Sequence, residues 1–276
     1  MPIDPAVAVG AELPGRDLAW DSTDVLQYHL AVGAGPDDLS YVYEGALRGV
    51  LPTFATVATT LRDTEPPTVT MPGIDIDLAR VVHGRQELEL HRPIPVKGRT
   101  RTRARIAAVH DKGSAAVVVT ETATELFTSR ISIFARGEGG FGGDRGPSTK
   151  VPPPERGPDA EVLSPTDPRQ ALWYRLLGDR NPLHVDPAFA RLAGFPRPIL
   201  HGLCTYGIAA KAVVDAVLDG DPDRLGGFSA RFAGVVFPGE TLRTRIWRED
   251  GRLVLLTTVA DRDDAPALAD AVITPR

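Results

Sequence analysis

Residues 176–202 read LLGDRNPLHVDPAFARLAGFPRPILHG, a loop that leads directly into a long apolar segment. The string Gly-Asp-Arg-Asn-Pro is turn-forming, and its proline disfavours helical backbone at Asn181. Asp179 and His184 are five residues apart, so a compact turn brings a carboxylate and an imidazole around one small volume. That pair is the minimum set for moving a proton to or from water. On spacing alone, however, an ordinary structural turn before a capped helix is the favoured interpretation of the stretch.

The segment after this loop changes that balance. Residues 202–218, GLCTYGIAAKAVVDAVL, are rich in alanine and apolar around most of a helical circumference, as expected for a helix enclosed by a sheet. The first N–H groups of a helix have no acceptor within it, and the helix N-terminus carries partial positive charge. A backbone N–H at Gly202 can therefore receive negative charge that develops on a carbonyl oxygen.

The rest of the chain indicates a duplication. Its middle is crowded with glycine and proline and has almost no apolar periodicity, which is typical of a linker. On either side, residues 95–124 and 237–260 repeat one order of features: proline and glycine, Arg-Thr-Arg, a glycine turn, then an aliphatic strand. Two unrelated hairpins can look alike, but four shared features in order favour duplication. The predicted divisions are an N-terminal repeat, a linker and a C-terminal repeat, at 1–140, 141–168 and 169–276.

Each half also has a candidate central helix ahead of its strands. In the second half it is residues 202–218, and in the first it is the shorter LPTFATVATTL at 51–61, whose β-branched residues weaken helix formation. We therefore predict an α+β fold made of two units, each a central helix followed by antiparallel strands.

Composition limits the classes of function. With 276 residues and 42% hydrophobic content, the chain can bury a substantial core. A net charge of −5 gives no basic field for nucleic acid or an anionic membrane surface, and no apolar run approaches the ~20 residues that span a bilayer. One cysteine and an N-terminus without signal-peptide character predict a cytoplasmic protein. The spacing of the histidines predicts no metal site, and no phosphate-binding glycine motif is present.

Residues 178–207, beginning GDRNPLHVDP, resemble the signature of the (R)-specific enoyl-CoA hydratases, the hydratase 2 or MaoC-like dehydratase family. The resemblance extends through YHLAVGAGPDDLSYVYEG at 28–45, HGRQELELHRPIP at 83–95 and RFAGVVFPGETL at 231–242, and covers most of the chain. It implies a double hot-dog fold, in which an antiparallel sheet wraps a central helix in each of two repeats.

The resemblance also implies residue roles. Asp179 and His184 match the pair that holds and deprotonates the attacking water and returns a proton to the α-carbon, and Asn181 matches the residue that positions them. Gly202 matches the glycine whose N–H binds the thioester oxygen. Four further positions match ones that contact substrate or CoA in relatives: His83, Gly84, Lys112 and Phe232. CoA is then part of the substrate, and no separate cofactor is expected.

The implied activity is the reversible hydration of trans-2-enoyl-CoA to (R)-3-hydroxyacyl-CoA, in a protein that forms a homodimer. Medium, long or branched chains are suggested by analogy, and a carrier-protein thioester stays open as substrate. A hot-dog thioesterase is one alternative, against which Asn181 and His184 argue. A non-catalytic acyl-thioester-binding module is the other, although it needs none of the four catalytic-site residues in combination.

Five other residues need an interpretation. Leu177 stands where the family usually has a small residue, so it either narrows the acyl pocket or packs away from it. His201 is expected to matter through its backbone rather than its ring, and Cys204 is expected to be a buried structural thiol. For Glu44 and Tyr28, a supporting role in the site and a plain structural role are equally favoured.

Overall fold

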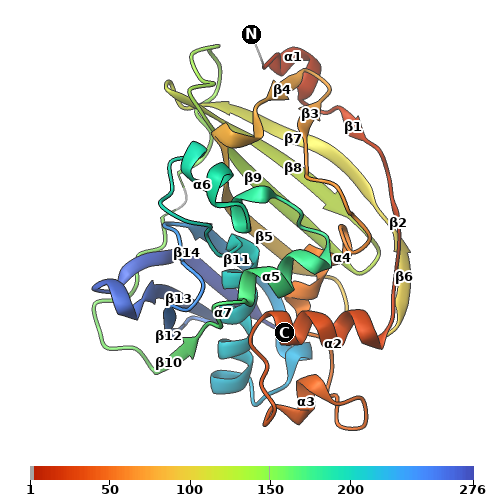
Figure 1. The fold of residues 1–276 in the computed structure, drawn as a ribbon, viewed down its shortest axis with the longest axis vertical. Helices are drawn as coiled ribbons and strands as arrows, with labels where there is room; N and C mark the ends of the chain where they lie inside the picture. Colours follow the sequence, from red (N-terminus) through yellow and green to blue (C-terminus); the bar gives the residue numbers. More distant parts are fainter. Residues whose placement is uncertain (1–2, 149) are drawn as a thin grey trace.

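The computed structural model describes residues 3–148 and 150–276 and contains one long, curved antiparallel sheet with helices on its concave side (Figure 1). The N-terminal half supplies five neighbouring strands of this sheet: β1 (Glu12–Leu13), β7 (Arg103–Asp111), β8 (Ala115–Ala123), β9 (Phe127–Arg136) and β5 (Val81–Leu90). The C-terminal half continues it with β11 (Leu225–Phe232), β14 (Ala265–Pro275), β13 (Arg252–Val259), β12 (Thr241–Glu249) and β10 (Ala160–Pro165). Two separate antiparallel pairs are β2 (Asp17–Trp20) with β6 (Gly98–Arg101), which are distant in the sequence, and the hairpin of β3 (Val69–Met71) and β4 (Ile74–Ile76).

The strand order repeats itself about the centre of the sheet. From each edge inward the order is a short strand, a hairpin, a return strand and a central strand, and the two central strands β5 and β11 pair antiparallel with Leu88 opposite Phe228. The hairpin β7–β8 therefore corresponds to β12–β13; one Arg-Thr-Arg triplet, 243–245, lies within β12, and the other, 101–103, spans the end of β6 and the start of β7. This arrangement confirms the predicted duplication and the double hot-dog fold.

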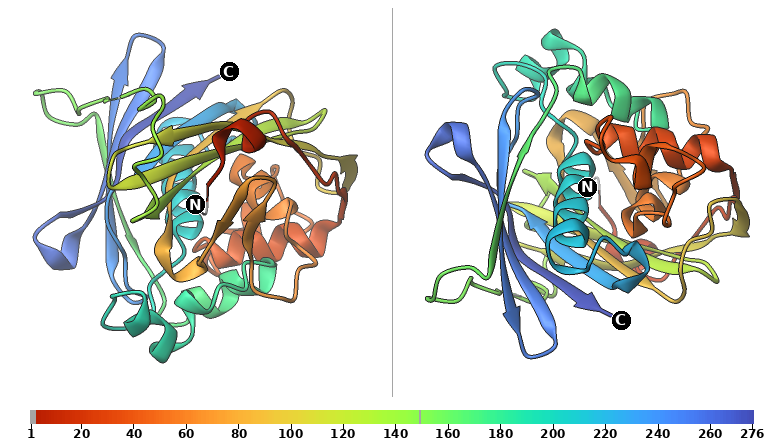
Figure 2. Two further views of the ribbon diagram at one scale, coloured as in Figure 1. Left: turned by 90° about the horizontal axis from the view of Figure 1, so that it is seen from above. Right: turned by 90° about the horizontal axis from the view of Figure 1, so that it is seen from below.

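Helix α7 (Gly202–Val217) runs through the concave side of the sheet, with the N-terminal helices beside it (Figure 2). Its small residues allow close packing: a Cβ added to Gly207 would lie 2.6 Å from the hydroxyl oxygen of Tyr28. The longest N-terminal helix, α2 (Ser22–Ala31), starts at a capping box in which Asp21 and Asp24 each accept from the other's backbone N–H. The other α-helices are short: α1 (Pro5–Ala8), α3 (Leu39–Val42), α4 (Ala55–Ala58), α5 (Gln170–Tyr174) and α6 (Pro187–Leu192).

The predicted central helix of the first half, 51–61, forms only in part. It consists of the 3₁₀ turn η1 (Pro52–Phe54) followed by the single turn α4. The hydroxyls of Thr59 and Thr60 bond back to carbonyls three residues earlier, which competes with continuation of the helix. The predicted helix at 51–61 therefore covers only residues 52–58 and is shorter than expected, as its β-branched residues suggested.

The predicted linker, 141–168, is also shorter than expected. Its last part is strand β10, which pairs with β12 and extends the sheet. The alternation of half-buried and exposed residues in Ala-Glu-Val-Leu-Ser-Pro is typical of an edge strand, but the flanking prolines hide it in the sequence. The first part packs against the N-terminal repeat, because the carboxylate of Asp111 accepts the backbone N–H groups of Gly140 and Gly142 at 2.9 and 2.6 Å.

The main hydrophobic core unites both repeats and contains residues of α2, α7 and both central strands. A separate small hydrophobic cluster consists of Leu183, Ala190 and Ile199. All three belong to the loop of residues 176–202, so the cluster packs the two ends of this loop against each other. Within the described ranges, no helix combines the length and the hydropathy that crossing a bilayer requires.

Candidate active site

A sharp turn carries the acidic residue of the predicted pair. The 3₁₀ turn η3 (Arg175–Leu177) ends at Gly178, whose φ of 107° is in the left-handed region. Only glycine fits here, because a Cβ at residue 178 would lie 1.7 Å from the backbone oxygen of Thr60. The chain then reverses through Asp179 and enters the 3₁₀ turn η4 (Pro182–His184), which ends at the predicted base.

Asn181 organises this turn through its backbone and its side chain. Its N–H donates to the carboxylate of Asp179 at 3.3 Å, and its side-chain oxygen accepts the N–H of Leu183 at 3.0 Å. The side chain thus caps η4 at its N-terminus. These two bonds connect the carboxylate of Asp179 to the turn that ends at His184.

The ring of His184 has a defined protonation pattern. Its Nδ1 lies 2.9 Å from the backbone oxygen of Ile199, and since a carbonyl oxygen only accepts, Nδ1 carries the proton. Nε2 is then the unprotonated nitrogen of the neutral ring. Burial lowers the pKa of His184, while the carboxylate of Asp179 and the bond to Ile199 act in the opposite direction. The ring is therefore a neutral proton acceptor at neutral pH.

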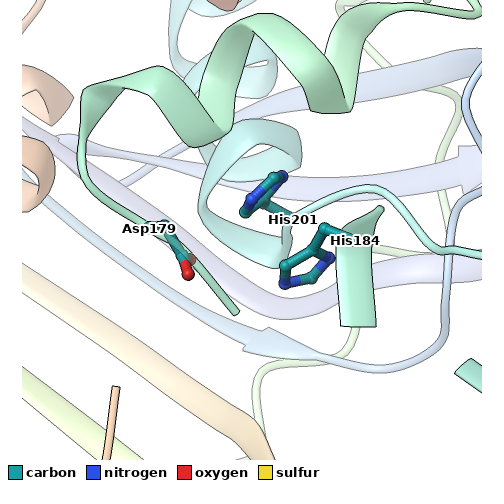
Figure 3. A group of neighbouring side chains, drawn as sticks. All are labelled: Asp179, His184 and His201. Atoms are coloured by element: carbon teal, nitrogen blue, oxygen red, sulfur yellow. The ribbon is translucent and has the colours of Figure 1, made fainter. Parts of the chain in front are cut away.

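His201 is the residue that sequence reasoning underestimated. Its ring stacks on His184, with ring centroids 3.7 Å apart and planes 25° from parallel, and both rings face Asp179 (Figure 3). The side chain is 1% exposed, and neither ring nitrogen has a hydrogen-bond partner within the described part of the chain. Burial and the neighbouring His184 lower the pKa of His201 well below its usual value, although the nearby backbone of Asp179 acts in the opposite direction. The only feature of the sequence that pointed to His201 is its position directly before Gly202.

Gly202 is the first residue of α7, so its N–H has no acceptor inside the helix. The ring of Phe232 covers this glycine, because a Cβ at residue 202 would lie 2.9 Å from that ring. His83 in turn packs on Phe232 with centroids 4.6 Å apart, and its Nε2 lies 3.0 Å from the backbone oxygen of Arg85. These three candidate residues from β5, β11 and α7 therefore meet at one place.

A cavity of about 500 Å³ contains this group of residues and is lined by both repeats. The C-terminal repeat contributes the candidate polar groups, including Asp179, Asn181, His184 and Gly202. The N-terminal repeat contributes apolar and polar wall residues in equal numbers, and the apolar ones are Val57, Pro67, Val69, Leu78, Val81, Val82, Ile131 and Ile133. A polar end and a long apolar wall are suited to a ligand with a reactive head and an aliphatic chain.

Two of the predicted substrate-binding residues are not on the cavity wall. Gly84 lies at an irregularity of β5, where a Cβ would approach the backbone oxygen of Ser132 at 3.2 Å. Lys112 lies in the turn between β7 and β8, and its ammonium group donates to the backbone carbonyl of Arg145. Both assignments stay predictions, while the structure brings together the other six candidates.

The structure also shows the surroundings of the four residues whose roles the sequence left open or structural. Leu177 is buried in the main core and does not line the cavity, so it packs away from the acyl site. Tyr28 is a core residue that packs on Phe54, and Glu44 is exposed. Cys204 is buried, its thiol donates to the backbone oxygen of Ala31, and burial raises its pKa.

A metal ion is the other ligand to consider here. Asp179, His184 and His201 each present a possible ligand atom, and these atoms lie within 4.8 Å of one another. Two histidines and one carboxylate can hold a divalent transition metal. The same three atoms can instead hold a small hydrogen-bonding molecule such as water.

Comparison with known proteins agrees with this architecture. Residues 149–264 match the model of the MaoC-like domain, and residues 19–137 match that of the MFE-2 hydratase 2 N-terminal domain. The chain is 51% identical to the enoyl-CoA hydratase ChsH3 of Mycobacterium tuberculosis, over all of both chains. It is 42% identical to the 3-hydroxyacyl-thioester dehydratase Y of the same organism, covering 97% of this chain and 95% of that one. It is 40% identical to the peroxisomal multifunctional enzyme type 2 of Mus musculus, covering 93% of this chain but only 37% of that enzyme.

Solved structures agree as well. The MaoC-like dehydratase from Phytophthora capsici superposes with a TM-score of 0.89 at 28% identity, covering 99% of this chain and 98% of that one. A Mycobacterium tuberculosis protein described as a double hot-dog superposes with a TM-score of 0.55 at 16% identity, covering 99% and 98%, which supports the fold alone. Fold and site together define a double hot-dog hydro-lyase. The chain belongs to the MaoC-like dehydratase family, and its first half is of the hydratase 2 type.

Proposed function

We propose that this chain catalyses the reversible hydration of a trans-2-enoyl-CoA to the (R)-3-hydroxyacyl-CoA. The observation that carries the proposal is one cavity whose wall contains a carboxylate, Asp179, a neutral imidazole, His184, and Gly202, whose N–H has no acceptor inside helix α7. The names of the relatives, an enoyl-CoA hydratase and a 3-hydroxyacyl-thioester dehydratase, support the same reaction class.

The chemistry follows from the demands of the substrate. A water held by Asp179 and His184 attacks the β-carbon, and its proton passes to Nε2 of His184 as the new C–O bond forms. The electron pair of the double bond moves toward the thioester, and the negative charge on its oxygen is stabilised by the N–H of Gly202. The acid–base pair then returns a proton to the α-carbon, so that the elements of water are added and the groups are restored.

The acid–base pair and the N–H of Gly202 are both needed for a useful rate. A preorganised backbone donor contributes on the order of 3 kcal/mol to such a step, and a placed acid or base contributes about 100-fold or more. Because the pKa of His184 is lowered by burial, its ring is available as an acceptor at neutral pH. The bond from Nδ1 to Ile199 keeps Nε2 on the reacting side.

The apolar wall supports an acyl chain as the second part of the ligand. A cavity of about 500 Å³ with aliphatic residues such as Val81, Ile131 and Ile133 is in the range of sites for small organic ligands. Carrier-protein thioesters share the same acyl head, so a panel of enoyl-CoA and enoyl-carrier substrates of increasing length defines the preference.

The test is hydration of crotonyl-CoA by the purified protein, followed by loss of the conjugated-thioester absorbance and by a thiol reagent for free CoA. Absorbance loss without thiol release supports the hydratase, thiol release supports a thioesterase, and neither signal with any chain length supports a binding module. Asp179→Asn and His184→Ala should each remove most turnover. Asp186→Asn is the matched control, because this exposed carboxylate caps α6 in the same loop and lies outside the cavity lining.

Two further expectations concern the protein in the cell. We infer a homodimer, to be measured by light scattering of the purified chain. We also infer a cytoplasmic location, to be measured by fractionation of the source cells. Neither inference bears on the chemistry, since the cavity is lined by the two repeats of one chain.

A further inference from the structure

Three polar atoms converge beside the reactive end of the cavity, and only two of them are used by the chemistry above; Asp179 and His184 line the cavity, whereas His201 is not among the lining residues. They are a carboxylate oxygen of Asp179, a ring nitrogen of His184 and a ring nitrogen of His201, all within 4.8 Å of one another (Figure 3). Atoms at such separations are bridged by one water when each hydrogen bond is about 2.8 Å long, with an angle near the tetrahedral one. A buried water of this kind typically has about three polar partners.

We propose that His201 is a third catalytic residue, whose ring N–H binds the oxygen of the nucleophilic water. This inference rests on the hydratase function proposed above. The hydrogen-bonding capacity of water supports the assignment: one hydrogen points to the carboxylate of Asp179 and the other to Nε2 of His184. Of the two lone pairs, one accepts the N–H of His201 and the other attacks the β-carbon of the enoyl thioester.

The structure supports this division between the two rings. His184 has a fixed tautomer, because its Nδ1–H donates to Ile199 and its second nitrogen can only accept. His201 has both nitrogens unpartnered among the described residues, so each of its tautomers keeps one N–H available. A neutral imidazole buried without any partner is unfavourable, and a bound water removes part of that cost. The water therefore satisfies a group that the protein alone leaves unpaired.

The position of His201 in the fold makes its contribution specific. It is the residue before Gly202, at the N-cap of α7, so the water contact and the N–H for the thioester oxygen are on adjacent residues. The stack on His184 fixes the planes of the two rings relative to each other. Movement of one ring would displace the other, and the distance between water and substrate would change with it.

The experiment compares two side chains of similar length, His201→Gln and His201→Met. Glutamine retains an N–H donor, whereas methionine removes it and keeps comparable apolar bulk. With crotonyl-CoA, we expect kcat of the Met variant to fall about 10- to 100-fold. The Gln variant should stay within about 5-fold of the wild type, and KM of both should stay within about 2-fold. Equal kcat values for the two variants, at any level, would overturn the proposal.

Two further measurements keep the test decisive. If the Met variant does not fold, His201→Phe replaces it, since phenylalanine also lacks the donor but preserves a flat ring to stack on His184. A high-resolution crystal structure of the wild type gives an independent result. We expect a water within hydrogen-bond distance of His201, His184 and Asp179, and a His201 ring that bonds elsewhere would refute the proposal. A wild type that hydrates no enoyl thioester would instead remove the hydratase function itself.

Discussion

The backbone oxygen of Thr60 occupies the space that a side chain at Gly178 would need: a Cβ there would lie 1.7 Å from it. Thr60 also donates its hydroxyl to the backbone oxygen of Leu177 at 3.3 Å. Thr60 belongs to the N-terminal repeat, while Gly178 begins the turn that carries Asp179. The N-terminal repeat therefore shapes the turn that carries Asp179, in addition to lining part of the cavity.

This contact predicts that Gly178→Ala removes activity and destabilises the chain. The methyl group would overlap a backbone atom that cannot rotate away, and φ of 107° is unfavourable for alanine. We expect a loss of at least 10-fold in kcat/KM and a lower urea midpoint. The matched control is Gly194→Ala, where φ is 88° but a Cβ would meet nothing within 4 Å. If both variants lose equally, the backbone angle rather than the contact with Thr60 is responsible.

The contact between Gly202 and Phe232 yields a second prediction. Gly202→Ala places a methyl group 2.9 Å from the aromatic ring, so either the ring or the start of α7 must shift. Because the N–H of residue 202 is the proposed oxyanion donor, kcat with crotonyl-CoA should fall about 100-fold, as for loss of one such donor. The double variant Gly202→Ala, Phe232→Leu has room for the methyl group and should recover part of the loss. No recovery would mean that the ring is not the obstacle.

His29 predicts how stability depends on pH. The ring is fully buried, with Nδ1 at 2.9 Å from the backbone oxygen of Tyr41, and Nε2 accepts the N–H of Leu51 at 3.1 Å. Burial lowers its pKa from 6.5 to about 4. The unfolded chain therefore takes up a proton first as pH falls, so stability present above pH 6.5 is lost progressively toward pH 4.

Urea unfolding at pH 7.5 and pH 5.0 measures this effect. Between these values His29→Gln should lose about 2 kcal/mol less stability than the wild type, because it removes one buried group that resists protonation. His91→Gln is the control, since that histidine is exposed. An equal pH effect in the His29 variant and the wild type would exclude His29 as the source.

The sequence predicted best where local pattern and tertiary structure agree. The apolar circumference of 202–218 marks α7 correctly, because a helix inside a curved sheet is buried on nearly all sides. It predicted less where tertiary contacts decide. The pattern at 51–61 is also apolar, but the threonine hydroxyls bond to the backbone and the helix stops at Ala58. Strand β10 exists because β12 offers an edge, which no local pattern reveals.

The same distinction applies to the candidate site. Asp179 and His184 are close in the sequence, and a tight turn is enough to bring them together. The stacking of His201 on His184 depends on how the 185–200 segment returns to the start of α7, which is a tertiary property. Lys112 was predicted to bind substrate only from the family resemblance. The residues next to it in the sequence do not reveal that it lies outside the cavity lining.

The cavity wall supplies the last prediction. Leu78 lines the cavity from the N-terminal repeat and is only half-buried, so a larger side chain can be placed there without disrupting the core. Leu78→Trp should lower kcat/KM for long-chain enoyl-CoA about 10-fold or more, because the lost volume must be taken from the acyl chain, whereas crotonyl-CoA should be nearly unaffected. Leu192→Trp is the control, since Leu192 is 75% exposed and lies outside the cavity lining. Equal losses for short and long substrates would mean that the acyl chain does not extend along this wall.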